Sequence, residues 1–206
     1  MSFYDDHVLP HLIGIACATP QIMKQRSLLV PAAEGRVLEV GFGSGTNLGF
    51  YDPTKVERLF ALEPSEGMRR KAAKAVSASP LDIEWLGLPG EEIPLEDDSV
   101  DTVVLTYTAC TIPDAAAALA QMRRVLKPGG RLLFSEHGAA PDAGVAKWQG
   151  RIEPVWKVLA GGCHLTRKPD QMIEAAGFRI EDLTAGYLPK SPKFAAFNYA
   201  GSARVG

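Results

Sequence analysis

The sequence predicts a doubly wound α/β fold: a mostly parallel, seven-stranded sheet with an antiparallel edge strand and helices on both faces. Three observations lead to this class. Short apolar runs alternate with amphipathic helical stretches along the chain. These runs are rich in leucine or β-branched residues and are bounded by charge and glycine, as in a parallel sheet covered on both faces. A glycine-rich turn directly follows the first run.

Seven runs are expected to form the strands. Five of them are expected to pair in parallel, and they lie at residues 36–40, 58–62, 81–85, 101–106 and 131–135. The run at 81–85 is the weakest of these. Two later runs, 178–183 and 194–200, are separated by a turn-rich stretch, and we expect them to pair antiparallel at the edge of the sheet.

Besides a helix after the glycine-rich turn, three helices are expected between the strands. The first lies at residues 65–76 and begins with Ser65, whose side chain is suited to capping a helix N-terminus. Residues 114–127 carry one apolar stripe at i, i+3, i+4 and i+7 spacing. Lys127 is a basic residue in the last turn, and the Pro-Gly-Gly that follows it at 128–130 cannot continue the helix. A third helix is expected at 169–176.

Length and composition exclude several classes of protein. The chain has 206 residues, 46% apolar and 22% charged, which is typical of a globular protein. The net charge is −2, without a dense basic stripe, so no nucleic-acid partner is expected. The three cysteines, Cys17, Cys110 and Cys163, form no CxxC pair and argue against a disulfide scaffold or a structural zinc site.

The first residues resemble neither a signal peptide nor a membrane span. The apolar stretch at 8–18 follows Asp5 and Asp6 where a signal peptide would be basic. It is also shorter than the roughly 20 residues that a membrane span needs. We therefore expect a cytoplasmic protein without a transmembrane segment.

The glycine-rich turn is a candidate ligand site. Gly41, Gly43 and Gly45 let the chain turn sharply and let a ligand approach the backbone. A helix is expected to begin here, with its free N–H groups facing an anionic group. Thr46 stands where a dinucleotide fingerprint has its last glycine, and no Lys follows as in a phosphate-binding loop. NAD and nucleoside triphosphates are therefore disfavoured, and a turn without a ligand stays an alternative.

Four motifs in order resemble the class I S-adenosylmethionine-dependent methyltransferases, with their type 11 domain and Rossmann-like fold. The segment 39–45, Glu-Val-Gly-Phe-Gly-Ser-Gly, is similar to the family's glycine loop, and Glu63 stands at the family's ribose-binding acid. Residues 90–104 and 124–134 are similar to the adenine-flanking segment and to the helix stop with the fifth strand.

The resemblance implies S-adenosylmethionine as cofactor and S-adenosylhomocysteine as product. It assigns to the cofactor site Glu39, Gly41, Gly43, Gly45, Glu63, Pro64, Met68, Gly90, Glu91, Thr106 and Tyr107. The sequence departs from the family at one point, because Pro89 and Gly90 stand where many relatives have an Asp beside the adenine. Adenine recognition is then expected from backbone groups or from Glu91.

We expect one domain over residues 1–206, with an N-terminal lid at 1–30, a cofactor-binding half at 35–137 and an acceptor-side half at 138–206. No feature of the sequence sets an oligomeric state. The second half is similar to the animal thiol methyltransferases and their bacterial relatives. The similar segments are 110–111, 135–137, 148–149, 154–156, 161–167 and 175–178. The animal proteins carry a hydrophobic N-terminal anchor, which is not expected here.

The acceptor side has several candidate residues. His137 ends a central strand and is expected to act either as a general base or by orienting the acceptor. His164 is a candidate for lining the acceptor pocket, and Tyr4 and His7 for facing the site from the lid. A nucleophilic Cys163–His164 pair is not expected, because methyl transfer needs no covalent enzyme intermediate.

Two further features leave alternatives open. His7 and His11 lack metal-ligand spacing, so no metal is expected. Trp148, Trp156 and Tyr187 either form an apolar pocket or cover a helix face.

These observations predict a methyltransferase acting on a small-molecule acceptor, with a thiol favoured. A lipid or quinone methyltransferase and a non-catalytic S-adenosylmethionine-binding regulator are the alternatives.

Overall fold

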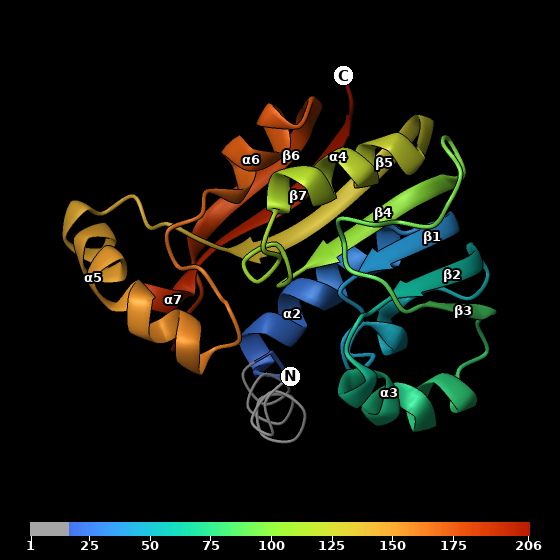
Figure 1. The fold of residues 1–206 in the computed structure, drawn as a ribbon, viewed down its shortest axis with the longest axis horizontal. Helices are drawn as coiled ribbons and strands as arrows, with labels where there is room; N and C mark the ends of the chain where they lie inside the picture. The colour runs from blue at the N-terminus through green and yellow to red at the C-terminus, as the bar shows by residue number, and fades with distance from the viewer. Residues whose placement is uncertain (1–16) are drawn as a thin grey trace.

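The computed structural model describes residues 17–206, and Tyr4 and His7 lie outside this range. It has a seven-stranded sheet in the order β3-β2-β1-β4-β5-β7-β6 (Figure 1). The strands are β1 (Gly35–Val40), β2 (Val56–Leu62), β3 (Ile83–Leu86), β4 (Val100–Thr106), β5 (Leu126–His137), β6 (Phe178–Tyr187) and β7 (Phe197–Val205). The predicted α/β fold is confirmed.

Strands β1 to β5 are parallel, and β7 runs antiparallel to both of its neighbours, β5 and β6. The antiparallel strand therefore lies one place inside the edge, which β6 forms. From β1 the chain continues in one direction to β2 and β3, and it later returns to β4 and β5 on the other side of β1. The carboxyl ends of β1 and β4 thus form the switch point at which doubly wound sheets bind ligands.

Helices cover both faces of the sheet. They are α2 (Pro20–Leu29), α3 (Glu66–Ala78), α4 (Ala115–Val125), α5 (Ala143–Leu159), α6 (Pro169–Ala175) and the short α7 (Lys193–Ala196). One buried cluster joins the sheet to α4 and α6, and a second joins it to α3 and the end of α2 (Figure 1).

The predicted helix starts are confirmed by their caps. The Ser65 hydroxyl accepts a hydrogen bond from the Met68 N–H at 3.3 Å, and Asp114 accepts one from Ala117 N–H at 2.9 Å. Both caps satisfy backbone donors that a helix leaves free in its first turn.

The expected helix after the glycine loop is absent. A single 3₁₀ turn, Leu48–Phe50, takes its place before β2 begins at Val56. Gly49 and Pro53 both disfavour a helix in this short connection, and Asp52 forms a turn by accepting from the Thr54 N–H. The expectation that a helix N-terminus faces the ligand here is therefore wrong.

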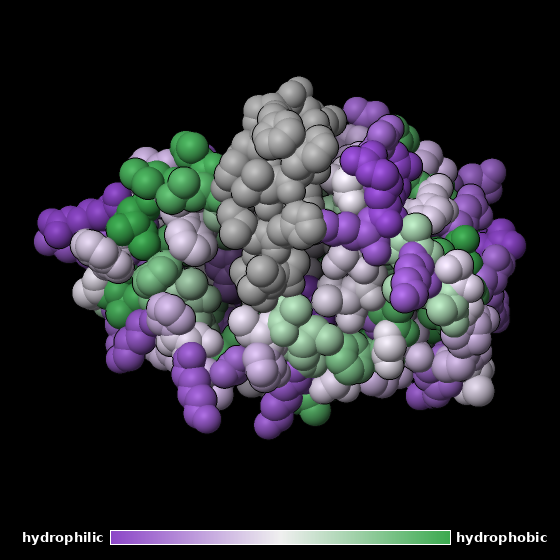
Figure 2. All heavy atoms as spheres, turned by 90° about the horizontal axis from the view of Figure 1, so that it is seen from below, coloured by the Kyte–Doolittle hydropathy of each residue, from purple (hydrophilic) through white to green (hydrophobic). Residues whose placement is uncertain are grey.

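Helix α5, which was not predicted from the sequence, projects at one end of the molecule (Figure 1). Its outer face exposes Trp148, Val155 and Val158, and apolar side chains gather at this end in Figure 2. Within residues 17–206, none of the helices combines the length and apolarity that a bilayer span requires.

Candidate active site

A cavity of about 180 Å³ opens at the carboxyl ends of β1, β2 and β4. Five of the residues expected to bind the cofactor line it: Gly41, Glu63, Pro64, Gly90 and Glu91. The other side is formed by the loop after β4, through Thr108, Thr111 and Ile112. The cavity thus lies at the switch point, where the cofactor site was predicted from the sequence.

The glycine loop has a backbone that favours glycine. Gly41, Gly43 and Gly45 have φ values of +73°, +59° and +79°. A Cβ on Gly41 would lie 2.2 Å from Thr108 Cγ2, so this position has no room for a side chain. A Cβ on Gly43 would meet nothing nearer than the Gly41 carbonyl at 3.9 Å, so the backbone is open to a ligand there.

Glu63 lies at the end of β2 with 7% of its surface exposed. Its carboxylate accepts hydrogen bonds from the Gly43 N–H at 2.8 Å and the Ser65 N–H at 2.9 Å, one on each oxygen. A carboxylate has about four acceptor positions, so each oxygen keeps one for a further donor. Burial raises the pKa of Glu63 above its ordinary value, and these two backbone donors oppose that rise.

Glu91 lines the cavity, whereas Met68 is not among its lining residues. The Glu91 carboxylate accepts a hydrogen bond from the Asp114 N–H at 3.1 Å, which ties the loop around Glu91 to the start of α4. Met68 is 9% exposed in the first turn of α3 and belongs to neither buried cluster.

Glu39 and Thr106 face a buried polar network under the glycine loop and not the cavity. Asn47 donates to Glu39 at 2.8 Å and to Thr106 at 3.0 Å, and Arg26 of α2 donates to both Asn47 and Thr106. Tyr51 completes the network with a 2.7 Å bond to Glu39. Burial raises the pKa of Glu39 to about 7, although its hydrogen bonds and Arg26 oppose the shift. The hydrogen bonds among these side chains hold the segment that follows the glycine loop in place.

Tyr107 also points away from the cavity. Its hydroxyl donates to Asn198 of β7 at 2.9 Å, and Arg26 lies over its ring at 5.2 Å. Burial raises its pKa to about 12. It lies at φ +54°, where the chain leaves β4 for the loop that lines the cavity.

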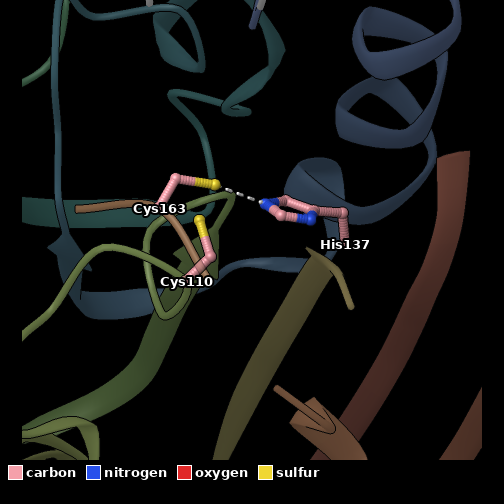
Figure 3. A group of neighbouring side chains, drawn as sticks. All are labelled: Cys110, His137 and Cys163. Carbon is pink, nitrogen blue, oxygen red and sulfur yellow. Dashed lines mark hydrogen bonds between the residues drawn. The ribbon is translucent and has the colours of Figure 1, made fainter. Parts of the chain in front are cut away.

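Cys110, His137 and Cys163 come together from three segments (Figure 3). His137 Nε2 lies 3.2 Å from Cys163 Sγ, and the three ligand-type atoms lie within 4.8 Å of one another. Cys110 follows β4, and His137 ends the neighbouring strand β5. Adjacent strand ends could have predicted this pair, but nothing local in the sequence indicates that Cys163 joins them.

His164 does not join this cluster. Its Nδ1 lies 3.2 Å from Glu153 of α5, and the same carboxylate accepts from the N–H groups of Leu165 and Thr166. Cys163 lies against His137 instead, so adjacency in the sequence does not bring Cys163 and His164 together as a pair.

The three aromatic residues lie mainly on helix and strand surfaces. Trp148 is 53% exposed on α5. Trp156 packs edge-on against Phe194, and Tyr187 packs edge-on against Phe197 and bonds to Asp142.

Comparison with known proteins places this geometry in a family. The model of the methyltransferase domain family matches residues 38–134. The chain is 38% identical over 152 residues to the thiol S-methyltransferase TMT1B of Homo sapiens, a match covering 71% of this chain and 62% of that protein. It is 34% identical over 152 residues to TMT1A of Homo sapiens, covering 72% and 62%.

Residues 38–134 form a methyltransferase domain.

The fold of the chain agrees with those of solved structures. An S-adenosylmethionine-dependent methyltransferase from Mesorhizobium loti aligns with a TM-score of 0.67 at 17% identity, covering 91% of this chain and 98% of that one. That likeness concerns the fold alone. The two thiol methyltransferases are longer, since this chain spans 62% of their length.

The residues present fit the family's cofactor. The positive-φ glycines leave the backbone open, and the Glu63 carboxylate keeps two acceptor positions at the cavity. Uncharged Pro64 and Ile112 line the same cavity and offer an apolar surface to an adenine ring. Among the described residues that line this cavity none is basic, which matches a ligand without phosphate groups.

Proposed function

We propose that this methyltransferase transfers a methyl group from S-adenosylmethionine to a small-molecule thiol. The observation that carries the proposal is the position of Cys110, between Thr108 and Thr111, which line the cofactor cavity. The loop that carries Cys110 is therefore also the loop that forms one wall of the cavity. The two TMT1 relatives, named for thiol methylation, support the same acceptor class.

The cofactor is held by backbone and carboxylate groups. Glu63 accepts hydrogen bonds from the ribose hydroxyls, the backbone at Gly41 to Gly45 adjoins the rest of the molecule, and Gly90 and Glu91 adjoin the adenine. Glu39 and Thr106 act as positioning residues, because they hold Asn47 and with it the loop. When bound, S-adenosylmethionine supplies a methyl group already activated by its sulfonium.

His137 orients the acceptor. Because the donor is activated, holding the acceptor in line and excluding water can supply most of the rate. His137 Nε2 already faces Cys163 at 3.2 Å, so this nitrogen is held within the cluster and is not free to accept a proton elsewhere. The lid predicted for residues 1–30 lies largely outside the described residues, and it stays a prediction, as does a cytoplasmic location.

The test is a transfer assay with labelled S-adenosylmethionine and purified full-length chain. The acceptor panel contains small thiols, amines, phenols, phospholipids and a quinone precursor, and Glu63→Ala serves as the low-binding control. We expect label in thiols first. Label confined to amines or phenols would contradict the thiol assignment, and label in no acceptor would favour the non-catalytic regulator.

A lipid or quinone acceptor is the second candidate. The exposed apolar face of α5 at Trp148, Val155 and Val158 favours it, because such a face suits an apolar substrate or its membrane. Preferential labelling of phospholipid or quinone in the same panel would support this reading.

A further inference from the structure

We propose that Cys110, His137 and Cys163 bind one Zn²⁺ ion whose fourth coordination position takes the sulfur of the acceptor thiol. The metal site is inferred from the described residues alone, and its role toward the acceptor rests on the proposed function.

The ligand set is the first reason. Two thiolates and one imidazole are ligands that Zn²⁺ prefers. A tetrahedral ion with Zn–S of about 2.3 Å and Zn–N of about 2.0 Å holds sulfur atoms about 3.8 Å apart and sulfur and nitrogen about 3.5 Å apart. The three atoms here lie within 4.8 Å of one another, with Cys163 Sγ and His137 Nε2 at 3.2 Å. Small side-chain rotations bring them to these separations.

The backbone that carries the ligands is fixed, which is the second reason. Glu136 is fully buried, and its Oε1 accepts from the N–H groups of Thr108 and Ala109 at 2.7 and 3.1 Å. From the other side, Arg167 donates to the carbonyl groups of Ala109 and Ile112. The loop that carries Cys110 is therefore clamped through both its donors and its acceptors.

Cys163 is held against this loop by a direct link. The His164 N–H donates to the Cys110 carbonyl at 2.8 Å, so the two cysteine segments adjoin through their main chains. Gly161 and Gly162, with φ values of +58° and +86°, turn the chain from the end of α5 into this position. Glu153 then holds the N–H groups of Leu165 and Thr166. The cluster thus comes from a defined backbone arrangement.

Three protein ligands with one open position are typical of catalytic zinc sites, whereas structural sites have four. Zn²⁺ with two thiolates is neutral overall, so an acceptor thiolate makes the site anionic and suited to attack a cationic methyl donor. On binding, the acceptor thiol loses its proton to water. A sulfur–methyl bond then forms while the methyl–sulfonium bond breaks, and the electron pair of that bond stays on the donor's sulfur.

The first experiment measures metal binding without any substrate. Full-length chain is equilibrated with Zn²⁺ against a weak chelator under reducing conditions, and bound metal is measured by mass spectrometry. Co²⁺ is added in parallel, because its absorption reports thiolate ligands and tetrahedral geometry. We expect one ion per chain with thiolate-to-cobalt absorption. Less than stoichiometric metal, or cobalt without thiolate absorption, overturns the proposal.

Matched variants locate the site. Cys110→Ser, Cys163→Ser and His137→Asn should each weaken Zn²⁺ binding by at least about tenfold. His164→Asn changes the neighbouring histidine, and Cys17→Ser changes the remaining cysteine, and both should keep the metal. Loss of metal in Cys17→Ser would overturn the open position, because Cys17 would then be a fourth ligand. If a cluster variant does not fold, the cobalt spectrum of the unchanged protein still decides.

The second experiment compares thiol methylation by metal-free and reloaded protein. We expect methylation to fall on metal removal and to return with Zn²⁺. Full methylation by metal-free protein overturns the metal's role and leaves the proposed function intact. Metal binding in a protein that methylates no thiol contradicts the proposed function and the acceptor role together, while the ion itself stays assigned.

Discussion

Replacing Glu63 by Ala tests the cofactor site at the side chain where the structure makes the most specific demand. The carboxylate is 7% exposed and keeps one free acceptor position on each oxygen. A hydrogen bond to a charged group contributes about 1.5–3 kcal/mol, so two ribose hydroxyls give a ceiling of about 3–6 kcal/mol. Water can enter the space that Ala leaves, and its hydrogen bonds to the ribose hydroxyls recover part of this binding free energy. We therefore expect Glu63→Ala to weaken S-adenosylmethionine binding by at least about tenfold, or about 1.4 kcal/mol.

The assay is calorimetric titration with S-adenosylmethionine and with S-adenosylhomocysteine. Glu57→Ala is the matched control, since Glu57 is exposed on the same strand and far from the cavity. Thermal unfolding of each variant without ligand separates lost binding from lost fold. Equal Kd values for Glu63→Ala and the unchanged protein would refute the reasoning, because the carboxylate would then contact no ribose.

Three further predictions concern the loop, the buried network and a helix cap. Gly41→Ala should lower the free energy of unfolding by about 1–3 kcal/mol in urea titrations, because Gly41 has a positive φ and a Cβ there would contact Thr108. A Cβ on Gly49 would meet nothing within 4 Å, so Gly49→Ala should not lower it in this way. Equal losses in the two variants would contradict this reasoning. Glu39 has a folded-state pKa of about 7 against an ordinary 4.5. Between these two pH values the folded protein retains a proton that the unfolded chain releases. The contribution of Glu39 to the free energy of unfolding therefore falls by about 3 kcal/mol as the pH rises from about 4.5 to about 7. Glu39→Gln should flatten that fall in urea titrations between pH 5 and about pH 8, and an unchanged slope would show that Glu39 is ionised. Asp114→Ala should cost about 1 kcal/mol through loss of the bond to Ala117, while Ser77→Ala in α3 should cost less.

The parts of the fold that local rules control were predictable from the sequence. Ser65 and Asp114 have side chains that cap helices, and both cap them in the structure. Glu63 and the glycine loop follow directly after strands, and parallel strands end at one edge of the sheet. Local residue type and strand polarity were therefore sufficient to bring Gly41, Glu63 and Gly90 to one cavity.

Features that depend on packing between distant segments were not predictable in the same way. Helix α5 includes Gly144, Gly150 and Pro154, which interrupt its helical pattern, yet it forms 17 residues of helix. Helix α2 buries Arg26 against Asn47 and Thr106. Because of this contact, Glu39 and Thr106 belong to a buried polar network and do not line the cavity.

The acceptor side shows the same limit. Cys163 lies 26 residues after His137 and reaches it through a turn after α5. A one-residue neighbour, His164, instead pairs with Glu153. Adjacency in the sequence therefore does not indicate the partner of Cys163, and only the three-dimensional arrangement identifies the cluster.

The central claim is that the methyl group passes to sulfur at the junction of the cofactor cavity and the cysteine–histidine cluster. A single-turnover reaction tests it most directly, with the enzyme in excess over S-adenosylmethionine carrying a deuterated methyl group and with saturating thiol. The account predicts one deuteromethyl thioether for each S-adenosylhomocysteine formed, as measured by mass spectrometry. S-adenosylhomocysteine without the thioether, or neither product, would contradict it.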